Sequence, residues 1–422
     1  MDALVDVCGG DCPWGDIADL LRSSFSTFRD WGLTGGDLEE YRRLDPAVAR
    51  GFHVVAAADG LAVSHVQVVV RRLLFAGVAI PVCGIANVAT RPEWRGRGLA
   101  TRLLSTALAE CRARGIPLAG LYTGFLSDAY RVYRRLGFRD VAAETVYGAP
   151  TGEAVLPAVG GVEVRPLAPR DAAEAARLYG EASRSWGLVT AMREAFAERV
   201  FEKRFYHTFF YDEPERGVAL AAVVDGELAG YALAYHGGSL SRPYGDGSTG
   251  QIYELVAKSP GALRSLYGAA VEELARLGAR GVWLHAPPTP FYAEATGWMW
   301  RAGGGGTYMA AVIDGEVLSR LLAAALTRRM EETGVCGEGS VVLRAGHRIG
   351  FAVRGCEAEA SEAGPTIHMG EVNLLRLIHG EAALSRLIAS GRAVPHGVPG
   401  SVVAVLDEAF RGGLYVWPMD HW

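Results

Sequence analysis

An internal repeat is the feature that most constrains how this 422-residue chain can fold. In the first third, two apolar runs within residues 54–70 are separated by Asp59-Gly60. In the middle third, residues 220–233 repeat this pattern around Asp225-Gly226, 166 residues further on. An Asp-Gly pair between two apolar runs is typical of a tight β-hairpin turn. The repeat therefore indicates two α/β modules in tandem.

The two copies continue in the same way. The pair Val-Ala at 88–89 has a counterpart at 256–257, an offset of 168 residues. In the first copy, apolar residues at helical spacing predict a helix over about 99–114 with one buried face. In the second copy, the corresponding helix is expected over about 263–277.

The last part of the chain follows a different pattern, which begins after a glycine run, 303–306. It predicts a helix, a hairpin and further short helices, at about 316–330, 341–353, 371–390 and 401–410. Residues 415–422 are apolar and aromatic, so we expect the C-terminal end to be docked and not frayed. The fold class we expect is α/β followed by α+β, with domains at 1–150, 151–312 and 313–422.

The first module carries a candidate anion site between its strand and its helix. The residues are Arg95-Gly96-Arg97-Gly98-Leu99-Ala100-Thr101. Two glycines allow a tight turn, and the helix that follows offers unpaired N–H groups and the positive end of its dipole. Such a turn suits a pyrophosphate, although each arginine also fits a solvated surface role. The middle module lacks the paired glycines, so we expect only the first copy to bind a phosphate-bearing cofactor.

A second motif, Tyr133-Arg134-Arg135-Leu136-Gly137-Phe138, follows the next strand. The order of strand, Arg-x-x-Gly-x-Ala turn, helix, strand and this motif resembles the GNAT acyltransferases. The resemblance implies that the turn binds the pyrophosphate of acetyl-CoA. It also implies that the strand residues Val88, Ala89 and Thr90 contact the pantetheine and the acetyl carbonyl, and that Tyr133 lies beside the thioester sulfur.

The whole chain is similar to the Eis (enhanced intracellular survival) acetyltransferases. These combine an active GNAT fold, a degenerate one and a C-terminal domain like a sterol-carrier protein. The resemblance implies a homo-hexamer that acetylates amines of aminoglycosides or of protein lysines. It further implies that Tyr133 is the general acid and that the terminal carboxylate of Trp422 is the base. The family's Ser-Glu pair, which touches the cofactor, appears here as Ser127-Asp128 if one residue of length is allowed.

Alternatives remain open for several of these residues. Tyr133 also fits a packing role, and Trp422 also fits an anchored tail without chemistry. Aromatic side chains in the first helical stretch line an amine pocket or simply pack a helix hairpin; they are Phe25, Phe28, Trp31 and Tyr41. The aromatic run 205–211 and the cluster 298–300 fit a core or a subunit interface. As functional alternatives we keep a non-catalytic scaffold for lipid or acyl-CoA, and an enzyme whose acceptor is a protein amine.

Composition narrows the class of protein. Acidic residues outnumber basic ones by 47 to 42, which argues against non-specific binding to nucleic acid. No apolar segment is long enough to span a membrane, and the acidic start does not resemble a signal peptide. The six cysteines are few and dispersed, so we expect free thiols, no metal site and a cytoplasmic protein.

Overall fold

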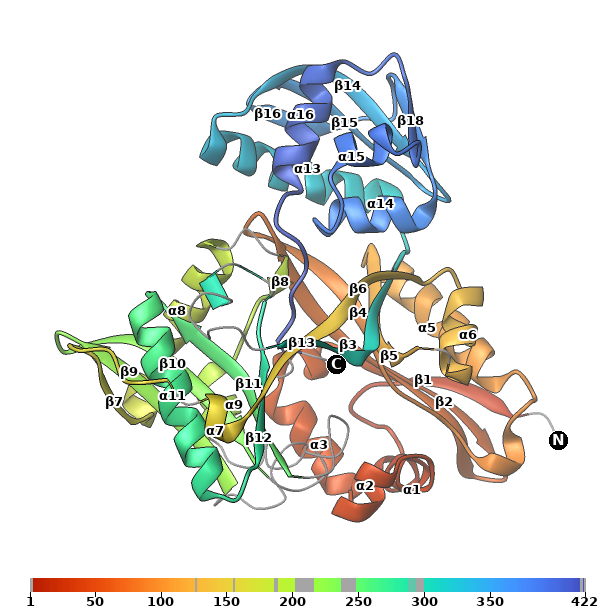
Figure 1. Cartoon of the computed structure of the whole chain (residues 1–422). Coiled ribbons are helices and arrows are strands. Elements are labelled where there is room, and N and C mark those ends of the chain that lie inside the picture. Colours follow the sequence, from red (N-terminus) through yellow and green to blue (C-terminus); the bar gives the residue numbers. More distant parts are fainter. Residues whose placement is uncertain are drawn as a thin grey trace.

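The computed structural model places the two repeats side by side on one continuous sheet, with the C-terminal domain above them (Figure 1). It describes residues 3–125, 127–154, 156–185, 189–201, 216–236, 248–287, 289, 291–292, 300–417 and 420. None of the described helices is long and apolar enough to cross a membrane.

The first module packs helices on both faces of its strands. Its elements are β1 (Leu4–Cys8), α1 (Trp14–Ser24), α2 (Ser26–Trp31), α3 (Gly35–Leu44), α4 (Pro46–Ala49), β2 (Phe52–Ala58), β3 (Leu61–Phe75), β4 (Val78–Thr90), η1 (Pro92–Trp94), α5 (Leu99–Ala113), β5 (Leu118–Gly124), α6 (Asp128–Arg135) and β6 (Arg139–Pro150). The predicted hairpin joins β2 to β3. Asp59 and Gly60 adopt positive φ angles of 50° and 78°, as such a turn requires. The helix predicted over 99–114 is α5.

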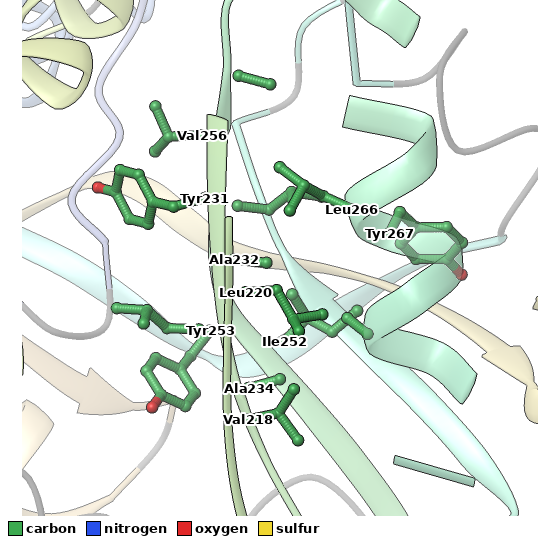
Figure 2. Close-up of a cluster of buried hydrophobic side chains, with 14 of the residues drawn as sticks. Val218, Leu220, Tyr231, Ala232, Ala234, Ile252, Tyr253, Val256, Leu266 and Tyr267 are labelled. Carbon is green, nitrogen blue, oxygen red and sulfur yellow. The ribbon is translucent and has the colours of Figure 1, made fainter. Parts of the chain in front are cut away.

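The second module repeats this order. Its elements are α7 (Thr151–Ala154), β7 (Glu163–Pro166), η2 (Pro169–Asp171), α8 (Ala172–Ser185), β8 (Thr190–Ala191), α9 (Phe196–Phe201), β9 (Gly217–Val224), β10 (Glu227–Tyr235), β11 (Thr249–Ala257), α11 (Pro260–Arg276), β12 (Gly281–His285) and β13 (Trp300–Val312). Asp225 and Gly226 have φ angles of 50° and 84°, so both hairpins use the same turn. In Figure 2, α11 packs Leu266 against one face of the strands, while Tyr231 and Tyr253 lie on the other.

The two modules exchange strands, which the sequence did not predict. The sheet runs β1-β2-β3-β4-β5-β13-β6-β12-β11-β10-β9-β7. Strand β13 belongs to the middle segment in sequence, but it lies between β5 and β6 of the first module. The glycine run at 303–306 is part of this strand and does not form a linker. Strand β6, which ends at residue 150, pairs with β13 on one side and with β12 on the other, so the sheet is continuous from the first repeat to the second.

The C-terminal domain is an α+β unit, as the pattern indicated. Its elements are α13 (Gly315–Thr333), β14 (Gly337–Arg344), β15 (Arg348–Gly355), β16 (Glu357–Ala360), β17 (Thr366–Met369), α14 (Glu371–Ile378), α15 (Leu384–Ala389), β18 (Ala393–His396) and α16 (Gly400–Ala409). The predicted hairpin pairs Val341 with Phe351. After α16 the chain returns to the junction of the two modules, where the Tyr415 N–H donates to the Val189 carbonyl at 2.9 Å. Trp417 is fully buried, so the described part of the tail is docked.

The expectation of free thiols is wrong, because all six cysteines are paired. The three disulfides are Cys8–Cys12, Cys83–Cys111 and Cys336–Cys356. The sequence separations of 4, 28 and 20 residues do not reveal that these side chains meet. Cysteine usage therefore no longer supports a reducing compartment.

We predict that the denatured, unreduced protein contains no thiol that reacts with iodoacetamide, whereas prior reduction exposes six. Under native conditions a mild reductant should open Cys336–Cys356 first, because Cys336 is exposed whereas Cys83 and Cys111 are fully buried. Mass spectrometry after alkylation counts the modified residues. Alkylation of Cys83 or Cys111 without reduction would contradict the pairing.

Candidate active site

The first module opens between β4 and β5. These parallel strands pair at only three positions, from Val82 with Leu118 to Gly84 with Gly120. Beyond this point β4 continues to Thr90 and pairs only with β3, while β5 pairs with β13 on its other side. The two strands therefore diverge, and residues 85–90 present a strand edge that β5 does not cover. The predicted pantetheine-contacting residues, Val88 to Thr90, lie on this edge.

The glycine turn lies directly after that edge. Gly96 and Gly98 have φ angles of 75° and 76°, and no other atom lies within 4 Å of a Cβ built on either residue. Gly98 is the N-cap of α5 and offers no side-chain cap, so the first N–H groups of the helix remain available to a ligand. Both arginines bind the turn itself: Arg95 donates to the Thr90 carbonyl and Arg97 to the Glu93 carbonyl. Their described contacts stabilise the loop.

The remaining residues predicted to bind the cofactor differ in their exposure and in their contacts. Leu99 is buried, Ala100 is half-buried and Thr101 is exposed on the first turn of α5. Ser127 uses its hydroxyl to cap α6, accepting from the Tyr130 N–H at 3.0 Å. The Asp128 side chain is fully exposed beside Arg131. Ser127 therefore has a structural role in α6, and Asp128 faces solvent.

Tyr133 lies on α6 and is 7% exposed, with its ring 5.9 Å from that of Phe138. Burial raises the pKa of its hydroxyl to about 12. The phenol thus stays protonated at neutral and moderately alkaline pH and is available as a hydrogen-bond donor.

The second module has the same opening, but aromatic side chains fill it. Strands β11 and β12 pair from Thr249 to Ile252, and β11 then continues to Ala257, paired there with β10. The buried hydroxyl of Tyr292 donates to the Leu255 carbonyl at 2.5 Å. Leu255 corresponds to Asn87 in the first repeat, and Tyr292 packs against the tail residue Trp417 at 6.3 Å. The described part of the second module thus differs from the first in this contact as well as in the missing glycines.

Comparisons with known proteins agree with this geometry. Residues 13–141 match the family model described as an acetyltransferase (GNAT) domain. An uncharacterized N-acetyltransferase of Streptomyces griseus is 25% identical over 381 residues, which cover 82% of each chain. The chain is an N-acetyltransferase, and its residues 13–141 match the GNAT acetyltransferase domain.

Solved structures share the fold of this acetyltransferase over its whole length. A GCN5-related N-acetyltransferase from Kribbella flavida aligns with a TM-score of 0.70 and 19% identity, covering 100% of this chain and 99% of the other. Eis1 from Mycobacterium abscessus aligns with a TM-score of 0.62 and 17% identity, covering 99% and 100%. The predicted enzyme class is confirmed, and the Eis resemblance is supported at the level of the fold.

GNAT acetyltransferases in general use acetyl-CoA, and the residues present fit it. A pyrophosphate suits the uncapped start of α5 and the two glycines, since backbone N–H groups can approach it closely there. The uncovered edge of β4 suits an extended chain with amide groups, such as pantetheine.

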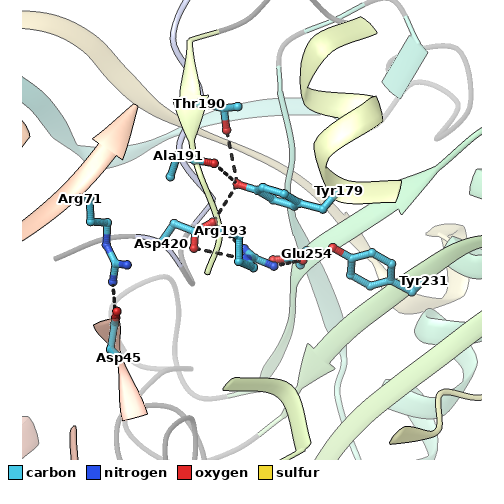
Figure 3. A network of polar contacts seen from close by, with 9 residues as sticks. All are labelled: Asp45, Arg71, Tyr179, Thr190, Ala191, Arg193, Tyr231, Glu254 and Asp420. Atoms are coloured by element: carbon cyan, nitrogen blue, oxygen red, sulfur yellow. Dashed lines mark hydrogen bonds and ion pairs between the residues drawn. The ribbon is translucent and has the colours of Figure 1, made fainter. Parts of the chain in front are cut away.

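The predicted terminal base, Trp422, lies outside the described residues, and so does His421. Two residues earlier, Asp420 is fully buried and accepts hydrogen bonds from the Tyr179 hydroxyl at 2.9 Å and from Arg193 (Figure 3). Arg193 also forms an ion pair with buried Glu254. A single guanidinium thus joins the tail of the acetyltransferase to its second module. The contact between Tyr179 and Asp420 could not be predicted from the sequence, because the two residues are 241 positions apart.

The predicted acceptor pocket of aromatic residues is only partly described. Phe28 is buried in the helical cluster and meets Phe25 edge to face at 5.6 Å, whereas Tyr41 packs against the core of the second module. These contacts favour the packing interpretation. The Trp31 side chain lies outside the described residues, as do the run 205–211 and the side chains of 298–300.

Sequence reasoning missed a buried polar chain behind β4. His53 Nδ1 lies 2.8 Å from His65 Nε2, and His65 Nδ1 lies 2.9 Å from the Asn87 carbonyl. The Asn87 side chain donates to Gln67 at 2.6 Å. Burial lowers the pKa of His53 to about 2 and that of His65 to about 4, so both rings are neutral. The sequence does contain a signal for this polar network: His53, His65 and Gln67 interrupt strands that are otherwise rich in valine.

We predict that the acetyltransferase loses stability in mild acid. His53, His65 and His379 have folded-state pKa values of about 2, 4 and 4, below the usual 6.5 of an unfolded chain. Between pH 6.5 and 5 these three histidines therefore become protonated in the unfolded state but stay neutral in the folded state. Each histidine should lower the free energy of unfolding by about 1.5 kcal/mol over this interval. Denaturant titrations from pH 7 to 5 test this, and a flat profile would contradict it.

Proposed function

We propose that this chain transfers an acetyl group from acetyl-CoA directly to a primary amine, of an aminoglycoside-like small molecule or of a lysine side chain. The observation that carries the proposal is the opening between β4 and β5, which adjoins the glycine turn at the start of α5. A buried phenol on α6 adds a hydrogen-bond donor to the same module. In the described part of the second module, Tyr292 occupies the corresponding opening, so we place the transfer site in the first module.

Direct transfer requires the carbonyl of the thioester to be polarised as the amine attacks. Backbone N–H groups of β4, between Val88 and Thr90, suit this role because β5 leaves that strand edge uncovered. An alkylammonium must also lose a proton before it attacks, since amines of this kind have a pKa near 8–10.

Tyr133 is proposed to donate a hydrogen bond to the thioester sulfur and a proton to the departing thiolate. A thiol has a pKa of about 8.5, well below the value of about 12 of the buried phenol, so Tyr133 acts on the developing thiolate chiefly by donating a hydrogen bond, and complete proton transfer to sulfur is uphill. The raised pKa ensures that the donor is present throughout the working pH range. A covalent route through Cys83 is disfavoured, because its sulfur is buried and paired with Cys111.

We further propose the Eis-like organisation for the whole chain. It comprises a GNAT domain at 1–150, a degenerate GNAT domain at 151–312 and a sterol-carrier-like domain at 313–422, assembled as a hexamer. The full-length structural match to Eis1 supports the order of the domains. The terminal carboxylate of Trp422 is the proposed base, and Asp420, two residues earlier, is anchored by Arg193.

We predict amine-dependent release of CoA from acetyl-CoA against a panel of aminoglycosides, polyamines and lysine peptides, followed with a thiol reagent. Tyr133→Phe should lower kcat by about 100-fold, because it removes the proton donor. Tyr267→Phe is the matched control, since Tyr267 is a buried helix tyrosine of the second module. The wild-type rate should show no decline near pH 10 from tyrosine ionisation. Absence of acetyl-CoA binding would overturn the proposal.

Blocking the C-terminal carboxylate tests Trp422 separately. Amidation, or a short C-terminal tag, should lower kcat at least tenfold while the Kd for acetyl-CoA stays within about twofold. The same tag at the N-terminus is the control. Unchanged turnover of the C-terminally blocked enzyme would remove Trp422 from the mechanism.

A further inference from the structure

We infer that His65, held by His53, is a positioning residue that fixes the peptide between Asn87 and Val88 as the donor to the thioester carbonyl. This inference rests on the proposed acetyl transfer and adds to it the side chains that set the donor's direction. Both histidines lie in the β2–β3 hairpin, one strand or more away from the opening.

A β-bulge at Asn87 is the first step of the argument. His65 pairs with Ala89 and Gln67 pairs with Ala86, so β4 contains one residue more than β3 over this stretch. Asn87 takes up the extra residue with a φ angle of +49°, a conformation that costs non-glycine residues free energy. Such a backbone persists only where its surroundings hold it.

Hydrogen bonds from β3 hold this residue at two points. His65 Nδ1 bonds the Asn87 carbonyl at 2.9 Å, and Gln67 accepts from the Asn87 amide at 2.6 Å. His65 and Gln67 are almost fully buried, so water does not compete for these contacts.

The tautomers of both histidines follow from the Asn87 carbonyl, which is the acceptor at the end of this series of hydrogen bonds. A carbonyl oxygen only accepts, so His65 Nδ1 must carry the hydrogen, and a neutral ring then leaves Nε2 as an acceptor. His53 Nδ1, at 2.8 Å, must therefore donate to it. His53 in turn packs against the edge of Trp14 at 5.0 Å. Only one tautomer of each ring allows both hydrogen bonds to form, and these bonds fix the orientation of the His65 ring.

The direction of the peptide is the last step. A trans peptide places its carbonyl and its N–H on opposite sides, and the described chain has no cis bond. With the Asn87 carbonyl bound to His65, the Val88 N–H points away from that ring. The edge of β4 away from β3 is the one that β5 leaves uncovered, where the acetyl group is proposed to bind. The bulge thus turns an ordinary strand N–H into a fixed donor.

The test replaces the histidine donor and preserves its volume. His65→Phe should lower kcat by about 100-fold, in the range for a lost oxyanion donor, with the Kd for CoA changed less than threefold. His65→Asn keeps an N–H donor at the position of Nδ1 and should restore most of the rate. Gln67→Met removes the second contact to Asn87 and should lower kcat by a smaller factor.

His379→Phe is the matched control. His379 is also fully buried, its Nδ1 lies 2.8 Å from the Leu375 carbonyl, and it belongs to the C-terminal domain. Its replacement should cost similar stability and leave kcat unchanged. Equal losses of kcat in the two phenylalanine variants would overturn the inference.

A spectroscopic measurement reports on the donor directly. The infrared band of a ¹³C-labelled ketone analogue of acetyl-CoA, in which CH₂ replaces sulfur, should lie at lower frequency when bound to wild type than when bound to His65→Phe. An identical band in both would overturn the inference. If His65→Phe does not fold, Gln67→Met against wild type provides the same comparison. Wild-type enzyme that neither binds the analogue nor turns over would instead overturn the proposed function.

Discussion

The parallel pairing of β4 with β5 ends after three residue pairs, and the proposed chemistry depends on this early end. Strand β5 is held on its other side by β13 over seven pairs, from Leu118 to Gly124. Because β5 is paired with β13 along its whole length, it cannot also stay paired with β4 where β4 and β13 diverge. The opening is therefore bordered by a strand from the middle segment, and the sheet of the first module is continuous only through β13.

The chain contains two such openings, one in each repeat, and their surroundings differ. The glycine turn leaves the start of α5 free in the first copy, whereas the second copy begins α11 with a side-chain cap from Ser259. In the second opening, Tyr292 bonds a strand carbonyl and Trp417 packs behind it. An aromatic side chain placed in such an opening satisfies a backbone carbonyl and buries apolar surface.

Buried polar groups fix the two segments on which the proposed mechanism depends. Neutral histidines hold the bulge of β4, and Arg193 holds the tail through Asp420. Removing one partner from such a buried pair leaves an uncompensated group, at a cost of about 3–5 kcal/mol for an ion pair. Both segments are consequently specified more sharply than hydrophobic packing alone would achieve.

The sequence by itself determined the features that a few neighbouring residues decide: both Asp-Gly hairpins, the helix over 99–114, the glycine turn at its start and the hairpin near 341–353. Turn dihedrals, helical periodicity and caps act over a handful of positions, so their signals can be read directly. Only the tertiary structure decided where β13 pairs, which cysteines meet, and that Tyr179 contacts Asp420 across 241 residues. These contacts depend on how separate elements pack, because residues far apart in the chain carry no local mark of their partners.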